Sequence, residues 1–234
     1  YIGMAGALSL IGTPDGRPVT PQNIIADYAG GGLMAAMGVC AALYEREKSG
    51  EGQLVDAAMS DGVTYLLAQF LSAFYGAGEL NERGKSIYSG TLPHYDVYET
   101  ADGKWITIGS LEPWFYANLC RTIGREDLVP HAWSEERRPE IREAFASAFK
   151  EKTRDELFAW LNETDLCANR LLELDELEDD EQVQARAMIV ELQGENGPVK
   201  QVGVAPKLSR TPMAARTVAA KPGAHTEEIL ASAG

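Results

Sequence analysis

The strongest local signal in the chain is a β-hairpin. Residues 95–99 and 105–108 are rich in aromatic and β-branched side chains, and the turn between them contains Asp102-Gly103. Helical patterns follow in residues 113–123, 138–150 and 154–161, and a capping box of Thr153 and Glu156 precedes the last of them. A hairpin followed by helices restricts the chain to a mixed α/β or α+β fold.

Two helices are also expected before the hairpin. Apolar residues recur at helical spacing from Leu33 to Tyr44, and Gly50 is placed to end that helix. Residues 53–57 could form a short strand, and Ser60 can cap a second helix. Residues 81–89 are polar, which indicates a linker and puts a domain boundary near residue 85.

The last part of the chain continues this mixture. Residues 171–187 are strongly acidic and helical in pattern, with Leu174, Leu177 and Val183 as candidate inward residues. Residues 188–204 predict two strands around a turn at residues 194–197, and Thr226 is placed to cap a short final helix.

The charge of the chain argues against two classes of partner. Its 234 residues carry 35 acidic and 21 basic side chains, a formal net charge of −14. This surplus of carboxylates disfavours binding to nucleic acid and to anionic bilayers. No apolar run reaches the roughly 20 residues that a membrane span needs, so we expect no membrane partner.

The cysteines and histidines give no sign of a metal site. Cys40, Cys120 and Cys167 are odd in number and far apart, which favours buried, reduced thiols and a cytoplasmic location. None of the three histidines has a partner at a metal-ligand spacing, and His94 after Pro93 is expected to be a loop residue rather than a base. We expect neither a metal nor a separate cofactor.

Two carboxylates are candidates for chemistry, each with a structural alternative. Asp27 lies among small apolar residues ahead of Gly30-Gly31-Gly32, so we expect partial desolvation, which would make it a better proton acceptor or nucleophile. The glycines would let backbone or a ligand approach closely. Alternatively, Asp27 only caps or turns the chain before the helix. Glu112 beside Pro113 equally fits a helix N-terminus, where the helix dipole favours an acid.

Several stretches stand in an order that matches a known family. They are Tyr1-Ile2-Gly3-Met4-Ala5-Gly6-Ala7-Leu8, Ile25-Ala26-Asp27-Tyr28-Ala29-Gly30-Gly31-Gly32, Gly50-Glu51-Gly52-Gln53-Leu54-Val55-Asp56, Ala101-Asp102-Gly103-Lys104-Trp105-Ile106, Leu111-Glu112-Pro113-Trp114 and Pro206-Lys207-Leu208-Ser209-Arg210-Thr211-Pro212. In this order they resemble the class III CoA-transferase family and, within it, the α-methylacyl-CoA racemases. The match extends over nearly the whole chain.

The resemblance implies an α/β fold with a Rossmann-like large domain, only partly present in this chain, and a smaller α+β domain. Residues 1–85 would be the second part of the large, CoA-binding domain and residues 86–187 the small domain. Residues 188–234 would return to the large domain, and an interlocked homodimer is implied. In the racemases a histidine in a His-Asp-Ile-Asn-Tyr-like motif is a catalytic base. Tyr1 matches the last residue of that motif, so this histidine is expected just ahead of Tyr1.

The resemblance also implies an activity and its residues. Asp27 matches a second base, and Glu112 matches an acid associated with the site. The expected substrate-binding positions are Tyr1, Gly30, Gly31 and Tyr95. The implied reaction inverts the α-carbon of a 2-methylacyl-CoA thioester by two-base 1,1-proton transfer through an enolate, with coenzyme A as part of the substrate.

Two alternatives to this activity stay open. CoA-transferases of the same family use the aspartate at the position of Asp27 as a nucleophile, which forms a mixed anhydride and then a CoA thioester. The chain as given could also be an inactive fragment or an interaction module, because its basic residues form no obvious phosphate cradle.

Overall fold

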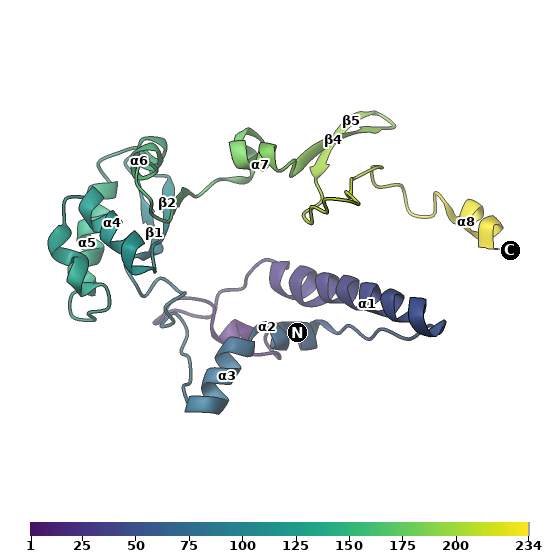
Figure 1. The fold of residues 1–234 in the computed structure, drawn as a ribbon, viewed down its shortest axis with the longest axis horizontal. Coiled ribbons are helices and arrows are strands. Elements are labelled where there is room, and N and C mark those ends of the chain that lie inside the picture. Colours follow the sequence, from purple (N-terminus) through teal and green to yellow (C-terminus); the bar gives the residue numbers. More distant parts are fainter. Residues whose placement is uncertain (234) are drawn as a thin grey trace. The chain divides into compact units, whose positions relative to one another are not determined.

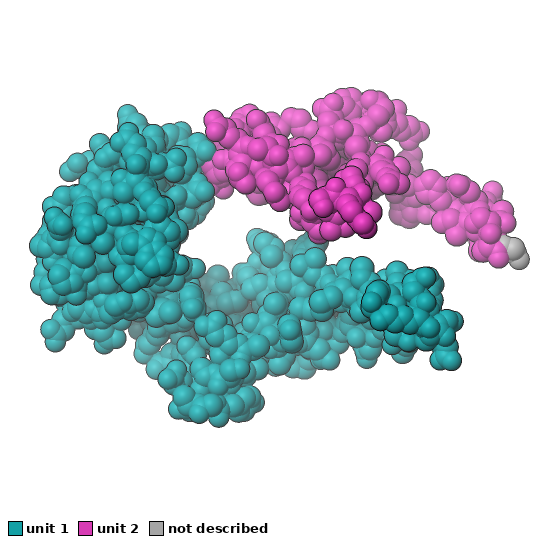
Figure 2. All heavy atoms as spheres, in the orientation of Figure 1, with its two compact units in different colours: residues 1–171 teal, residues 172–234 magenta. Residues whose placement is uncertain are grey.

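The computed structural model describes residues 1–233 and contains two compact units. The first unit is Tyr1–Leu171, and the second begins at Leu172 (Figure 2). The polar stretch at residues 81–89 therefore lies inside the first unit. The domain boundaries that we place near residues 85 and 187 remain predictions.

Helices make up more of the chain than strands do (Figure 1). The helices are α1 (Met34–Ser49), α2 (Met59–Leu66), α3 (Ala68–Ala77), α4 (Pro113–Thr122), α5 (Arg138–Phe149), α6 (Arg154–Leu161), α7 (Glu181–Ala185) and α8 (Thr226–Ala233). The strands are β1 (Tyr95–Glu99), β2 (Trp105–Gly109), β3 (Ala168–Arg170), β4 (Ile189–Gly194) and β5 (Gly197–Val202). A π-helical segment, Ile24–Leu33, leads directly into α1, and short 3₁₀ helices occur at Ala7–Ser9, Glu126–His131 and Leu174–Asp179.

Both sheets in the described residues are antiparallel. The first unit holds the order β1-β2-β3, in which Tyr95 pairs with Gly109 and Glu99 with Trp105, so the predicted hairpin is confirmed. The second unit holds β4 paired with β5, as expected around residues 194–197. Residues 53–57 form no strand, because no other described segment offers them an edge to pair with. The parallel, Rossmann-like sheet is thus not seen in residues 1–233.

One face of the three-stranded sheet carries the core. Tyr98, Ile106 and Ile108 are buried on it and pack with α4, α5 and α6. The helical side chains of this core are Tyr116, Leu119, Cys120, Ile141, Phe145, Phe149, Leu157 and Leu161. The capping box that we predict for α6 is present, with both the Thr153 and the Glu156 hydrogen bonds formed. The other face of the sheet, with Val97 and Trp105, is exposed.

Residues Ile24–Ser49 form one continuous helix of 26 residues, which ends at Gly50 as predicted. By length and composition it could cross a membrane, with a mean hydropathy of 1.4 in its most apolar window. The expectation that no such segment exists is therefore wrong, because glycine and alanine keep this run from standing out as an apolar stretch. Core helices of water-soluble proteins also meet this criterion, so no membrane role follows from it.

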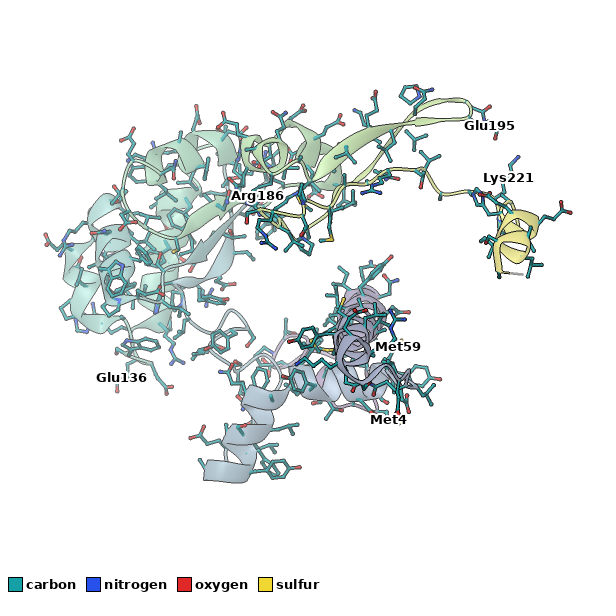
Figure 3. The ribbon with its side chains drawn as sticks, turned by 45° about the vertical axis from the view of Figure 1, so that its right-hand side comes forward. Met4, Met59, Glu136, Arg186, Glu195 and Lys221 are labelled. Carbon is teal, nitrogen blue, oxygen red and sulfur yellow. The ribbon has the colours of Figure 1, made fainter. Side chains whose placement is uncertain are left out.

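Glycines allow this helix to pack closely on α2. Gly30 and Gly31 are buried, and a β-carbon added to Gly62 would lie 1.9 Å from the Gly30 carbonyl oxygen. A β-carbon on Gly31 would lie 3.0 Å from Cγ of Met59, the first residue of α2 (labelled in Figure 3). The two backbones can approach this closely only because the residues at the contact have no β-carbon.

Two local expectations are wrong. The acidic segment at residues 171–187 is helical as predicted, with a six-residue 3₁₀ helix followed by the short α7, but Leu174 is 87% exposed rather than inward, because no described residue covers that side of the 3₁₀ helix. Among the three cysteines, all free thiols, only Cys120 is buried. Cys40 lies on a side of α1 that no described residue covers, and Cys167 precedes the edge strand β3.

Candidate active site

Asp27 lies in the π-helical segment that precedes α1. Its side chain is exposed, and no hydrogen bond or ion pair joins its carboxylate to another of residues 1–233. The expectation of partial desolvation is therefore wrong for the described chain. The reason is that α2 fills the space beside Gly30 and Gly31, and Asp27 remains outside that helix contact.

Glu112 is the N-cap residue of α4, which agrees with the prediction that it lies at a helix N-terminus. Its side chain nevertheless makes no capping hydrogen bond and is exposed. The helix start is held instead by Pro113 and by the Tyr116 N–H, which donates to the Glu112 carbonyl at 3.0 Å. The Glu112 carboxylate is thus free for a ligand.

Tyr95 and Glu112 lie at the same end of the three-stranded sheet. Tyr95 pairs with Gly109, and the Gly109 N–H donates to the Cys167 carbonyl at 2.8 Å. Burial first, and then the carboxylates of Glu112 and Asp165, raise the pKa of the Cys167 thiol. The Glu112 carboxylate is therefore close enough to Cys167 to affect its charge. Tyr95, Gly109 and Cys167 follow one another across the sheet.

A hollow of about 400 Å³ opens beside Tyr95. Tyr88 forms part of its wall, with its ring edge-on to the Tyr95 ring at 5.9 Å between centroids. Two further wall residues, Gly90 and Asp96, are held by Arg142, which pairs with Asp96 and donates to the Gly90 carbonyl at 2.7 Å. The hollow is thus a firm surface next to one predicted substrate-binding residue.

A second hollow, of about 330 Å³, is mainly apolar. Its wall includes Ile25, two residues before Asp27, together with Val63, Phe70 and again Tyr88. Tyr88 is therefore shared by both hollows. Sequence reasoning missed this residue because the polar composition of residues 81–89 indicated a linker, although an aromatic ring in such a stretch is a signal of contact.

The structure brings only some of the predicted site residues together. Neither hollow is lined by Asp27 or by Glu112, and Tyr1 is 75% exposed and lines neither. Gly30 and Gly31 are covered by α2, so no ligand can reach the space beside them in the described chain. The roles that we assign to these residues remain predictions.

His94 lies in the turn directly before β1, as predicted for a loop residue, and its side chain is fully buried there. Its ring packs on Tyr116 at 4.7 Å and edge-on to Trp133 at 5.6 Å between centroids. Among residues 1–233, neither ring nitrogen has a hydrogen-bond partner. Burial, and secondly the charge of Arg138, lower the pKa of His94 from 6.5 to about 4.

The low pKa of His94 predicts a loss of stability in mild acid. The folded pKa lies below that of the unfolded chain, so the stabilising contribution is complete above about pH 6.5 and is lost as the pH falls toward 4. Between pH 7 and pH 5, the free energy of unfolding of the wild type should fall by about 2 kcal/mol more than that of a His94→Phe variant. Urea unfolding at both pH values measures this difference, and an equal fall in the two proteins would contradict it.

Comparison with known proteins identifies relatives along the whole chain. A family model described as CoA-transferase family III matches residues 1–226. The alpha-methylacyl-CoA racemase of Mus musculus is 37% identical over 238 residues, which cover 100% of this chain and 61% of the mouse protein. The succinyl-CoA–L-malate CoA-transferase beta subunit of Chloroflexus aurantiacus is 32% identical and covers 97% of this chain and 58% of that protein. The chain thus spans about three fifths of the length of these relatives.

A solved structure supports the described fold. The crystal structure of a CAIB/BAIF family protein from Brucella suis matches 99% of this chain and 61% of that chain, with a TM-score of 0.81 and 22% sequence identity. At this identity the likeness concerns the fold alone. It confirms a mixed helix and sheet architecture shared with CaiB/BaiF proteins.

Proposed function

Because the chain belongs to CoA-transferase family III, we propose that the whole protein is an isomerase that inverts the α-carbon of 2-methylacyl-CoA thioesters. The observation that carries this proposal is the 37% identity to a mammalian alpha-methylacyl-CoA racemase over 100% of the chain. The free carboxylates of Asp27 and Glu112 add support, since neither has a structural partner among residues 1–233.

The proposed reaction is a proton transfer on one carbon. A base removes the α-proton, the C–H electron pair forms a C=C bond, and the carbonyl π pair moves to oxygen to give an enolate. An acid on the opposite face then returns a proton to the α-carbon, and the C=O bond re-forms. Asp27 is the proposed base on one face, and the histidine expected ahead of Tyr1 acts on the other. The Tyr95 hydroxyl is the proposed hydrogen-bond donor to the enolate oxygen.

The exposure of Asp27 adds one requirement to this mechanism. A hydrated carboxylate is a weak base toward a carbon acid, so the bound thioester itself must displace water from Asp27. The hollow that includes Ile25 suits the acyl chain of such a substrate, because its wall is mainly apolar. We therefore propose that this hollow receives the acyl chain.

The architecture implied by the family is part of the same proposal. A Rossmann-like large domain, to which residues 1–85 and 188–234 contribute, would bind coenzyme A as part of the substrate. We further propose an interlocked homodimer in the cytoplasm that uses no metal and no other cofactor.

CoA transfer between carboxylic acids is the second candidate. The 32% identity to a succinyl-CoA–L-malate CoA-transferase subunit favours it, as does an unpaired, exposed Asp27, which is accessible as a nucleophile. In that reaction the Asp27 carboxylate attacks the thioester carbonyl, coenzyme A leaves as the thiolate, and an aspartyl–acyl anhydride forms. The returning thiolate then attacks the aspartyl carbonyl of the anhydride, which forms an aspartyl-CoA thioester and releases the donor acid as its carboxylate.

Deuterium exchange should separate the two activities. When the whole protein is incubated with one enantiomer of a 2-methylacyl-CoA in D₂O, we expect deuterium at the α-carbon together with loss of chirality, because both steps pass through the enolate. Mass spectrometry and chiral chromatography measure these changes. Transfer of CoA to an added dicarboxylic acid without α-exchange, with hydroxylamine trapping at Asp27, would instead establish the transferase.

A further inference from the structure

The segment that carries Glu112 is attached to His94 on both sides. Before Glu112, the Ser110 N–H donates to the His94 carbonyl at 2.8 Å. After Glu112, the His94 ring packs on the Tyr116 ring, and the Tyr116 N–H donates to the Glu112 carbonyl at 3.0 Å. One buried residue thus contacts both the approach to α4 and its first turn.

The surroundings of His94 leave it little freedom to move. His94, Ser110 and Tyr116 are each at most 1% exposed. The Trp133 ring also contacts the imidazole, edge-on at 5.6 Å between centroids, and the Tyr98 hydroxyl donates to the carbonyl of neighbouring Pro93 at 2.6 Å. The Tyr116 ring is held in turn, because its hydroxyl donates to the Leu128 carbonyl at 3.1 Å. Close packing of this kind transmits a change at one side chain to its neighbours.

The position of the Glu112 carboxylate depends on this attachment. The carboxylate makes no capping hydrogen bond, so only the backbone of residues 110–112 and the start of α4 fix where it lies. The paired sheet strands end at Gly109, before Glu112 is reached. His94 therefore supplies the tertiary contact to this short connection.

We propose that His94 is a positioning residue for Glu112, whose ring and carbonyl together hold the carboxylate in its working place. This inference rests on the proposed racemase function, in which Glu112 acts at the site. The role needs a flat ring that keeps the contacts with both the Tyr116 ring and the Trp133 ring. Its nitrogens have no hydrogen-bond partner in residues 1–233 and are not required for this role.

Kinetics of the whole protein test the proposal. His94→Ala should lower kcat for α-proton exchange about 100-fold, the effect expected when a reacting group is displaced by about 1 Å. The KM should stay near the wild-type value, because the acyl-CoA contacts are not altered. His94→Phe should restore most of kcat, since a phenyl ring fills the same space. If His94→Ala does not fold, His94→Leu is tested in its place, because leucine fills the space without a flat ring. The expected loss of kcat is the same.

A matched variant separates positioning from simple loss of stability. Leu157→Ala removes a fully buried side chain of α6 from the same core but leaves the attachment of Glu112 intact. It should lower the melting temperature and leave kcat unchanged. Equal loss of kcat in His94→Ala and Leu157→Ala would overturn the proposal, and so would wild-type kcat in His94→Ala.

A third variant tests the premise separately. Glu112→Gln should reduce exchange strongly if Glu112 acts at the site. If Glu112→Gln is inactive while His94→Ala is fully active, only the positioning role fails. If Glu112→Gln is fully active, the role of Glu112 in the proposed function fails, whatever the His94 variants show.

Discussion

An Asp27→Asn variant of the whole protein is expected to lose α-proton exchange by about 10³-fold or more, in the upper part of the range typical of a general base. The amide has nearly the shape of the carboxylate but cannot accept the proton. Asp27 is exposed and has no partner in residues 1–233. The free energy of unfolding of the Asp27→Asn variant should therefore remain within about 0.5 kcal/mol of the wild-type value. Exchange in D₂O and thermal unfolding measure the two effects on the same preparation.

Asp15→Asn is the matched control for this charge change. Asp15 is also exposed, lies in the turn at residues 12–18 and lines neither hollow. The Asp15→Asn variant should exchange the α-proton at the wild-type rate. Full activity of Asp27→Asn would remove Asp27 from either proposed mechanism, whereas a large loss of stability would mean that the carboxylate has a structural partner.

Gly62→Ala is expected to cause the largest loss of stability of any glycine-to-alanine change in the first unit. The new β-carbon would lie 1.9 Å from the Gly30 carbonyl oxygen and 2.7 Å from its Cα, and both are backbone atoms that cannot turn aside. The two helices must separate, so the free energy of unfolding should fall by about 3 kcal/mol. Urea unfolding measures the change, and the melting temperature should fall by roughly 6–12 °C.

Gly76→Ala gives the opposite expectation at a comparable site. Gly76 is also inside a helix, α3, but an added β-carbon would meet nothing within 4 Å. Alanine has the higher helix propensity, so this variant should be more stable than the wild type by about 0.5–1 kcal/mol. Wild-type stability in Gly62→Ala would mean that the two helices do not cross as closely in solution as described.

The elements that sequence reasoning predicts well are those set by neighbouring residues. The Asp102-Gly103 turn specifies its own hairpin, and the capping box of Thr153 and Glu156 marks the start of α6 through hydrogen bonds within one turn. Gly50, with a φ of 78°, ends α1 where a residue with a β-carbon would be strained. Each of these features is complete within a few residues, so the sequence contains all of the information.

Features that depend on distant residues are predicted less well. The triple glycine after Asp27 shows that something approaches closely, but not that the approaching element is α2. The exposure of Asp27 follows from that contact and is therefore missed. The prediction that Leu174 points inward is wrong for a related reason, since an apolar side chain is buried only if another element covers it. The family motifs make Asp27 and Glu112 candidates for the site, whereas the distance between the two carboxylates in space depends on the whole fold.

Tyr88 has a practical consequence for mapping the specificity of this protein. Its ring belongs to the walls of both hollows, so any substitution there reshapes two surfaces at once. A change in chain-length preference caused by Tyr88 alone cannot be assigned to either surface. Phe70 lines only the apolar hollow and Thr107 only the other, so a mutational scan that begins with these two residues can attribute each selectivity change to one surface.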